Sequence, residues 1–222
     1  MPKKQIFTFL KDLENNNSKA WMDEHRDRYF IAKNSWLAEI EEILSLLSKY
    51  DFDYFSQFKP KETISRINNN RRFNQSLPIY KNYFTFSVMD KSDGFSPLHI
   101  SVGPGQSFIG CGYHNPDKEL LKKIRDAIDY DGQVLQDILH QTDFEDFFGG
   151  LSTFKEPLKT SPRAYAKDHP HVDLLRFKSF IVSRNLSDEE ATGADFLNIL
   201  EQAFVLSKAF RDYLKRAGSF EI

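Results

Sequence analysis

The chain has 222 residues, of which 40% are hydrophobic and 28% charged, and its formal net charge at pH 7 is −2. This length and balance predict a soluble protein with a single domain over residues 1–222. A net charge so close to zero argues against nucleic acid or an anionic membrane as the partner. The one cysteine, Cys111, excludes an intramolecular disulfide and favours a cytoplasmic location. No run approaches the roughly 20 apolar residues of a membrane span, and the N-terminus lacks the apolar centre of a secretory signal.

The first sixty residues have a helical pattern. Apolar residues recur there at the spacing of one helix face: Ile6, Phe9, Leu10 and Leu13. Asparagines at positions 15–17 then end this first helix. Ser18 or Asn17 can cap a longer second helix that extends to Leu47. Residues 51–60 are expected to form a loop anchored by aromatic side chains.

The middle of the chain has a β pattern. Strands are expected at residues 63–68, 83–89, 98–102 and 107–113. The Gly103-Pro104-Gly105 sequence marks the turn between the last two of them. Because short turns join successive strands, we expect these strands to pair antiparallel as a meander. No charged residue occurs between Pro97 and Pro116, which is typical of a buried central hairpin.

After the β region the chain returns to a helical pattern. The Asn115-Pro116-Asp117 sequence predicts a helix start, with a cap residue and proline at the first helical position. An apolar stripe follows as far as Ile128, and a second helix is expected around residues 134–139.

The C-terminal part of the chain completes the predicted fold. Ser187 with Glu190 fits a capping box, and Asp195 opens a long final helix that closes at Gly218. The expected fold class is therefore α+β, with an antiparallel β-meander in the middle of the chain packed by N- and C-terminal helices.

One stretch of the β region is unusual in its charge. Residues 64–89 contain no Asp or Glu, although the chain has 32 acidic residues. The stretch carries Arg66, Arg71, Arg72 and Lys81 among many asparagines. Cations and amide donors without a nearby counter-charge must find anions elsewhere in the fold or in a ligand.

The sequence has no strong catalytic signature. Phosphate-cradling loops, nucleophile elbows and paired zinc histidines are missing, and no cofactor is predicted. Cys111 lies in an apolar strand without an adjacent base, so we expect a buried, unreactive thiol. Asp168, His169, His171 and Asp173 lie close together, but Asp-His-Pro-His is equally typical of a turn and a helix start, so no metal site is predicted.

Two segments together could form an anion site. Arg163 follows Pro162 in an irregular stretch, where functional side chains are often displayed. If it meets the acid-free stretch in space, the ligand-binding residues are Arg66, Arg72, Lys81 and Arg163. Such a pocket would hold a phosphate or carboxylate by charge-assisted hydrogen bonds.

Two other interpretations remain open at this point. The cations could pair with acids of the terminal helices, such as Asp12, Glu119 or Asp126, in a protein–protein interaction module that has structural arginine networks and no catalysis. Single-stranded nucleic acid could instead stack on aromatic residues of the acid-free stretch, but the net charge argues against it. The sequence indicates no oligomeric state.

Several motifs give the chain a family resemblance. They are Phe9-Leu10, Asn16-Asn17, Trp21, Arg66-Ile67, Arg72-Phe73, Tyr80-Lys81, the run SVGPGQSFIGCGYHNPD, Arg125, Leu158-Lys159, Pro162-Arg163, Asp168-His169-Pro170 and LLRFKSF. On these motifs the chain resembles the domain-of-unknown-function 2461 family of bacterial and fungal proteins over nearly its whole length. The resemblance implies an α+β fold and carries no assigned reaction.

The chain departs from that family's usual pattern in the acid-free stretch. Asn69 and Asn70 stand where the family usually has Arg and Asp, and Ile79 stands where it has Pro. Because asparagine cannot act as a general base, binding is favoured over acid–base catalysis. If the protein is an enzyme, His169 or Tyr80 would be the residues that move protons.

Overall fold

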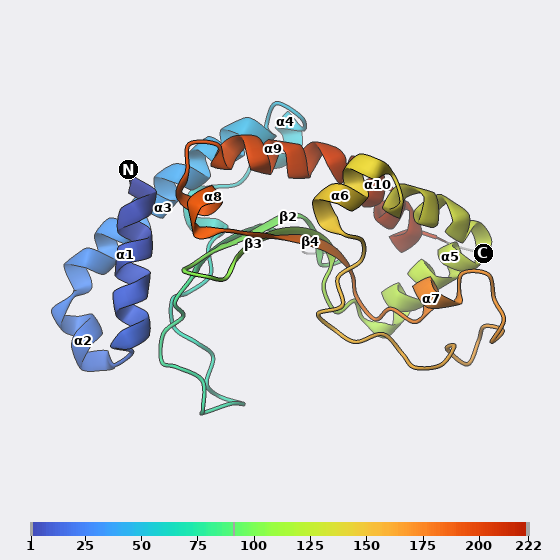
Figure 1. Ribbon diagram of the computed structural model, residues 1–222, viewed down its shortest axis with the longest axis horizontal. Coiled ribbons are helices and arrows are strands. Elements are labelled where there is room, and N and C mark those ends of the chain that lie inside the picture. Colours follow the sequence, from blue (N-terminus) through green and yellow to red (C-terminus); the bar gives the residue numbers. More distant parts are fainter. Residues whose placement is uncertain (1, 91, 221–222) are drawn as a thin grey trace. The chain divides into compact units, whose positions relative to one another are not determined.

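A computed structural model describes residues 2–90 and 92–220 of the chain (Figure 1). The elements follow one another as α1 Pro2–Asn15, α2 Lys19–Glu24, α3 Arg26–Leu47, α4 Phe52–Phe55, η1 Pro60–Glu62, β1 Phe84–Val88, β2 Phe95–Val102, β3 Ser107–Tyr113, α5 Lys118–Leu139, α6 Thr142–Phe148, α7 Val172–Leu175, β4 Phe180–Leu186, α8 Asp188–Thr192, α9 Phe196–Leu206 and α10 Lys208–Gly218. The class is α+β, as the sequence predicts.

The chain divides into two compact units. The first comprises residues 1–88, 99–109 and 185–201, and the second comprises residues 89–98, 110–184 and 202–222. Strands β2, β3 and β4 each contribute residues to both units. The single domain expected over residues 1–222 stays a prediction.

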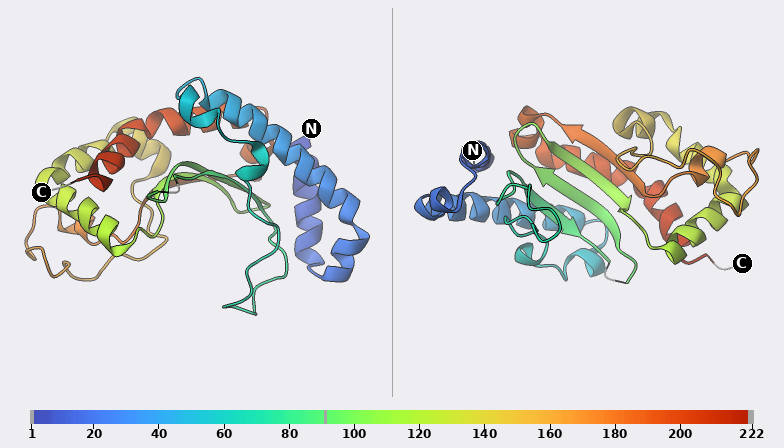
Figure 2. Two further views of the ribbon diagram at one scale, coloured as in Figure 1. Left: turned by 180° about the vertical axis from the view of Figure 1, so that it is seen from behind. Right: turned by 90° about the horizontal axis from the view of Figure 1, so that it is seen from below.

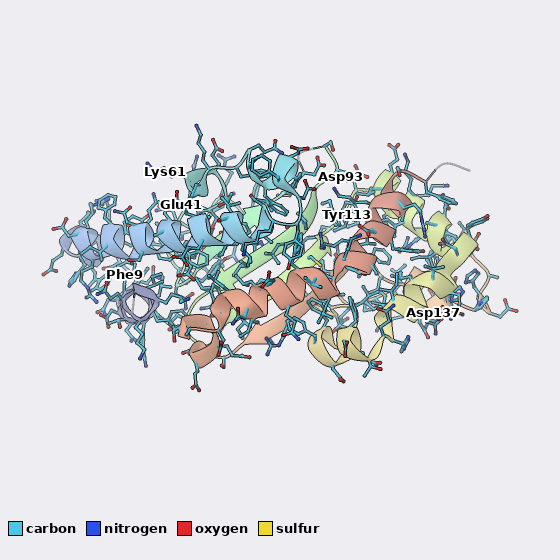
Figure 3. The ribbon with its side chains drawn as sticks, turned by 90° about the horizontal axis from the view of Figure 1, so that it is seen from above. Phe9, Glu41, Lys61, Asp93, Tyr113 and Asp137 are labelled. Atoms are coloured by element: carbon cyan, nitrogen blue, oxygen red, sulfur yellow. The ribbon has the colours of Figure 1, made fainter. Side chains whose placement is uncertain are left out.

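The sheet is antiparallel, with its strands in the order β1-β2-β3-β4. Its β2–β3 hairpin turns through Gly103-Pro104-Gly105, and nearly all of its strand residues are buried or half-buried. This confirms the buried central hairpin predicted from the uncharged stretch. At the end of β3, the Tyr113 hydroxyl donates a hydrogen bond of 2.7 Å to the Asp93 carboxylate; Figure 3 labels both residues.

The predicted strand at residues 63–68 is wrong. Only Asn68 in that segment makes a β-bridge, to Tyr80. Nearer its start, the Ser65 amide donates to the Thr85 side-chain hydroxyl at 3.0 Å instead of to a strand carbonyl. A side-chain partner of this kind replaces the backbone ladder and ends regular pairing. The fourth strand is instead β4, at residues where the sequence pattern predicted no strand.

Several helix boundaries were predicted correctly because they depend on local hydrogen bonds. Ser18 accepts from the Trp21 amide and caps α2, and Ser187 forms a capping box with Glu190 at α8. The long second helix, however, is interrupted at His25, which separates α2 from α3. The final helix is likewise divided into α9 and α10, with Ser207 between them.

Helix α5 is longer than predicted. It begins after Asp117, whose side chain accepts from the Leu120 amide, and runs through both expected helices to Leu139. Asp131 alone inside it has non-helical backbone angles, φ −137° and ψ 34°. Asn115, expected as the cap, has φ 53° and lies in the left-handed region. The two predicted helices are therefore one element with a kink.

Candidate functional site

The acid-free stretch forms a narrow hairpin, residues 66–81, which we name the basic arm. Its two legs are joined by backbone hydrogen bonds from Asn69 to Ile79 (3.0 Å) and from Lys81 to Ile67 (2.8 Å). Figures 1 and 2 show this segment running away from β1 as a thin loop. The basic arm therefore belongs to the first unit and offers its tip to solvent.

The base of the basic arm is fixed to the loop that follows α1. The Asn17 side chain donates to the Tyr80 carbonyl (2.8 Å) and accepts from the Tyr80 amide (2.9 Å). This pair of bonds satisfies both backbone groups of Tyr80, as an antiparallel strand would. The Tyr80 side chain is 7% exposed. The residue suggested as a proton carrier is thus mainly a buried anchor of the arm.

The asparagines of the arm shape its tip. The Asn70 side-chain oxygen accepts from the Arg72 amide, and that of Asn74 accepts from the Ser76 amide. Both are local turns in which a side chain replaces a backbone acceptor. The Asn69 side chain donates to the Pro78 carbonyl at 2.9 Å. These amides, which the sequence suggested as ligand donors, therefore have structural partners.

The cations of the arm differ in what they contact. The Lys81 ammonium donates to the Ser65 hydroxyl (3.0 Å) and the Arg66 carbonyl (2.9 Å), and partial burial lowers its pKa. Arg66 and Arg72 are exposed, and within the described ranges neither side chain has a hydrogen bond or an ion pair. Two guanidinium groups of the arm are thus available to an anion.

Two of the three acids proposed as structural partners, Asp12 and Asp126, have other contacts. Asp12 pairs with Arg28, and Asp126 pairs with Lys122. Asp126 also accepts a hydrogen bond of 2.8 Å from the Tyr165 hydroxyl. Neither acid forms an ion pair with the arginines proposed for the ligand site.

Arg163 and His169 lie in the second unit, in the irregular segment between α6 and α7. Arg163 is exposed and has no ion pair among the residues that the structure describes. His169 is held at both ring nitrogens: Nδ1 accepts from the His171 amide, and Nε2 lies 3.0 Å from the Asp129 carboxylate. Because Nδ1 is an acceptor here, the proton is on Nε2. His169 thus positions this segment on α5.

Two further contacts of this segment lie along the same helix. The Tyr165 hydroxyl reaches Asp126, and His171 Nδ1 lies 3.1 Å from the Gln136 side-chain oxygen. Gly132 makes room for the His171 ring, because a Cβ at that position would lie 2.6 Å from it. In the part of the chain that the structure describes, no group of three or more His, Cys, Asp or Glu side chains could hold a metal ion.

One arginine of the second unit was not among the predicted site residues. Arg125 on α5 is half-buried, and its Nη2 donates to the Phe177 carbonyl at 3.1 Å. Its Nε is buried and has no hydrogen-bond partner. The sequence indicates this burial by the position of Arg125, which lies between Ile124 and Ala127 on the apolar stripe of the helix. A guanidinium there must be partly desolvated.

Two of the hollows lined by described residues lie in the first unit, away from the predicted site residues. The larger has a volume of about 490 Å³, the smaller about 270 Å³. The larger is lined by Lys4, Phe7, Thr8, Lys11, Pro104, Asp188, Glu189 and Thr192. The smaller lies between α1 and α3, beside Phe9 and Arg28.

Fold and site together define an α+β protein with an exposed basic arm and, in its second unit, a polar segment docked on α5. Residues 5–213 match the family model of DUF2461, described as a conserved hypothetical protein. The chain belongs to the DUF2461 family, which confirms the resemblance found in its sequence motifs. No curated protein and no solved structure matches the chain. None of the described helices is both long and apolar enough to span a membrane.

Proposed function

We propose that this protein binds a small anionic ligand, bearing a phosphate or carboxylate group, through the basic arm. Arg66 and Arg72 supply the principal donors, and Lys81 adds positive charge at the base. Arg163, which lies in the second unit, is proposed separately as an anion donor. The cytoplasm is the expected compartment, which is consistent with an unpaired Cys111 thiol.

The observation that carries this proposal is the absence of carboxylate partners. Within residues 2–90 and 92–220, Arg66, Arg72 and Arg163 have no ion pair, whereas Arg26, Arg28 and Arg216 each have one. Guanidinium groups bind oxyanions through parallel N–H donors, and this capacity is unused in Arg66 and Arg72.

The contacts of the two candidate proton carriers favour binding over catalysis. Tyr80 is buried at the base of the arm, and His169 is engaged at both ring nitrogens. A catalytic acid or base must reach the proton that it transfers. His169 and Tyr80 therefore remain only secondary candidates for catalysis.

A second candidate function is docking of a protein partner at the tip of the arm. Phe73 is 89% exposed and Leu77 is 38% exposed. Aromatic residues next to arginines are enriched where protein surfaces meet. On this reading the arginines of the arm would orient a partner rather than hold a small molecule.

Anion binding can be tested by thermal-shift screening with phosphorylated metabolites, nucleotides and dicarboxylates. A ligand at about 100 times its dissociation constant stabilises the folded state by roughly 2.7 kcal/mol. Arg72→Ala should weaken binding of the best hit more than about tenfold, the loss of roughly one charge-assisted contact. Arg26→Ala is the matched control, because Arg26 is an exposed arginine that already pairs with Asp23.

Two outcomes would count against the proposal. If Arg72→Ala leaves the affinity unchanged, the arm is not the anion site. If it lowers the thermal midpoint in ligand-free buffer as much as a core mutation does, the residue is structural. Phe73→Ala separates the two candidate functions, because it should abolish partner docking and leave small-anion affinity within about twofold.

A further inference from the structure

Arg125 is a half-buried cation whose hydrogen-bonding capacity is mostly unused. A guanidinium carries five N–H donors. Arg125 makes one hydrogen bond, from Nη2 to the Phe177 carbonyl, and its buried Nε has no partner. Among the described residues no carboxylate lies within ion-pair distance of it. Its neighbours in the structure therefore leave both charge and donors uncompensated.

This arrangement is costly in the empty protein. Burial lowers the pKa of Arg125, but arginine keeps its proton in proteins, so the desolvation penalty remains. The neighbouring group that acts on it electrostatically is Tyr165. That phenol donates a hydrogen bond to Asp126, and burial together with Asp126 raises the pKa of Tyr165. Tyr165 thus stays neutral and cannot serve as the counter-anion.

Asp126 is also unable to fill that role. Its carboxylate accepts from the Tyr165 hydroxyl at 2.8 Å and pairs with the Lys122 ammonium at 2.5 Å. Two donors of its own therefore compensate the charge of Asp126. Among the described residues the charge of Arg125 therefore has no anionic partner, and its Nη1 group, unlike the buried Nε, is accessible and makes no hydrogen bond.

We infer that Arg125 is the principal donor of an oxyanion site in the second unit, which takes a phosphate or carboxylate group. The anion would lie against Nη1 and the remaining N–H of Nη2, in the end-on bidentate arrangement that guanidinium groups form with oxyanions. The Phe177 carbonyl fixes the orientation of the group through Nη2. This site goes beyond the basic arm, since it uses different residues in the other unit.

The test uses the intact protein and its arginine side-chain Nε–Hε signals in NMR spectra. Inorganic phosphate and acetate are titrated separately, with chloride holding the ionic strength constant. The signal that disappears in Arg125→Lys is assigned to Arg125. In the wild type this signal should shift saturably with at least one of the two anions, and the anion that binds identifies the ligand class. Arg176→Lys is the matched control, because Arg176 also has a buried Nε but already pairs with Asp173.

The variants add an independent readout. Measured by isothermal titration calorimetry, Arg125→Lys should weaken binding of that anion more than about tenfold, since lysine lacks the planar fork, while Arg176→Lys stays within about twofold. Arg72→Ala should leave this site intact, so failure here is distinguishable from failure of the basic arm. If neither anion shifts the Arg125 signal, water alone solvates the group and the inference is wrong. Equal affinity in Arg125→Lys would also overturn it.

Discussion

Asp131, the residue at which α5 departs from helical geometry, accepts a hydrogen bond of 3.0 Å from the hydroxyl of Tyr213 on α10. Its other carboxylate oxygen accepts from Arg216 Nη2 at 2.6 Å. Tyr213 is buried, so its hydroxyl depends on this acceptor. The kink in α5 thus lies at the residue that forms hydrogen bonds with α10, a helix about 80 residues further along the chain.

We expect Asp131→Asn to lower the free energy of unfolding by about 1–2 kcal/mol, because the amide keeps an acceptor for Tyr213 but loses the charge that faces Arg216. Urea denaturation measures the change. Asp137→Asn is the control on the same helix, where an exposed carboxylate accepts from Gln133, and it should change stability by less than about 0.5 kcal/mol. Equal losses in the two variants would show that the contacts of Asp131 add nothing.

Gly112 on β3 is expected to tolerate no side chain. Its φ is +120°, and a Cβ there would lie 2.1 Å from the Phe180 carbonyl oxygen. Gly112→Ala should therefore destabilise the protein by more than about 3 kcal/mol, combining backbone strain with displacement of the adjacent strand. Gly105→Ala is the control, since Gly105 also has positive φ but nothing within 4 Å of a Cβ, and should cost about 1 kcal/mol. Similar chemical-denaturation midpoints for the two variants would contradict the steric argument.

The Cys111 thiol should react slowly with a thiol reagent in the native protein. Cys111 is buried, and burial raises its pKa to about 11, so little thiolate forms at neutral pH. The comparison is Ser76→Cys, which places a second thiol on the exposed tip of the basic arm. The added thiol should react at least about a hundredfold faster than Cys111, because Cys111 becomes accessible only when the structure opens. Comparable rates would mean that Cys111 is accessible.

The same raised pKa predicts a loss of stability at high pH. The folded-state pKa of Cys111 is raised from 9.0 to about 11, so between these values the unfolded chain has lost a proton that the folded chain keeps. Stability is therefore full below pH 9 and falls as the pH rises toward 11. From pH 8 to pH 10 the wild type should lose about 1.3 kcal/mol more than Cys111→Ala, which has no thiol to titrate. Parallel pH profiles from urea denaturation would rule out this coupling.

Local features of the sequence predicted part of this fold well. The β2–β3 hairpin was evident because alternation, turn residues and the lack of charge agree over residues 97–116. The caps at Ser18 and Ser187 were evident because each bonds an amide three residues away. Strand β4 was missed although Phe180 and Val182 alternate with less buried residues, since its pairing partner β3 lies far along the chain.

The candidate site was predictable only in part. Charge patterning located the basic arm, and the structure finds Arg66 and Arg72 exposed there without ion pairs within the described residues. Lys81 was predicted as a ligand donor, but its ammonium contacts Ser65 and the Arg66 carbonyl. Arg125 was named only among the family motifs and not as a site residue, because its sequence neighbours, which include Asp126, do not show that it lacks an ion pair.

The sequence by itself determined the α+β class and the caps at Ser18 and Ser187, because these depend on hydrogen bonds and periodicities within a few positions. It also determined the family, through its motifs. Only the tertiary structure decided which cations are neutralised. Asp12 faces Arg28, and Asp131 faces Arg216 across 85 positions of sequence, while Arg125 meets a carbonyl instead of an acid. Ion pairing requires two side chains to approach within a few ångströms in space, and sequence proximity does not determine that distance.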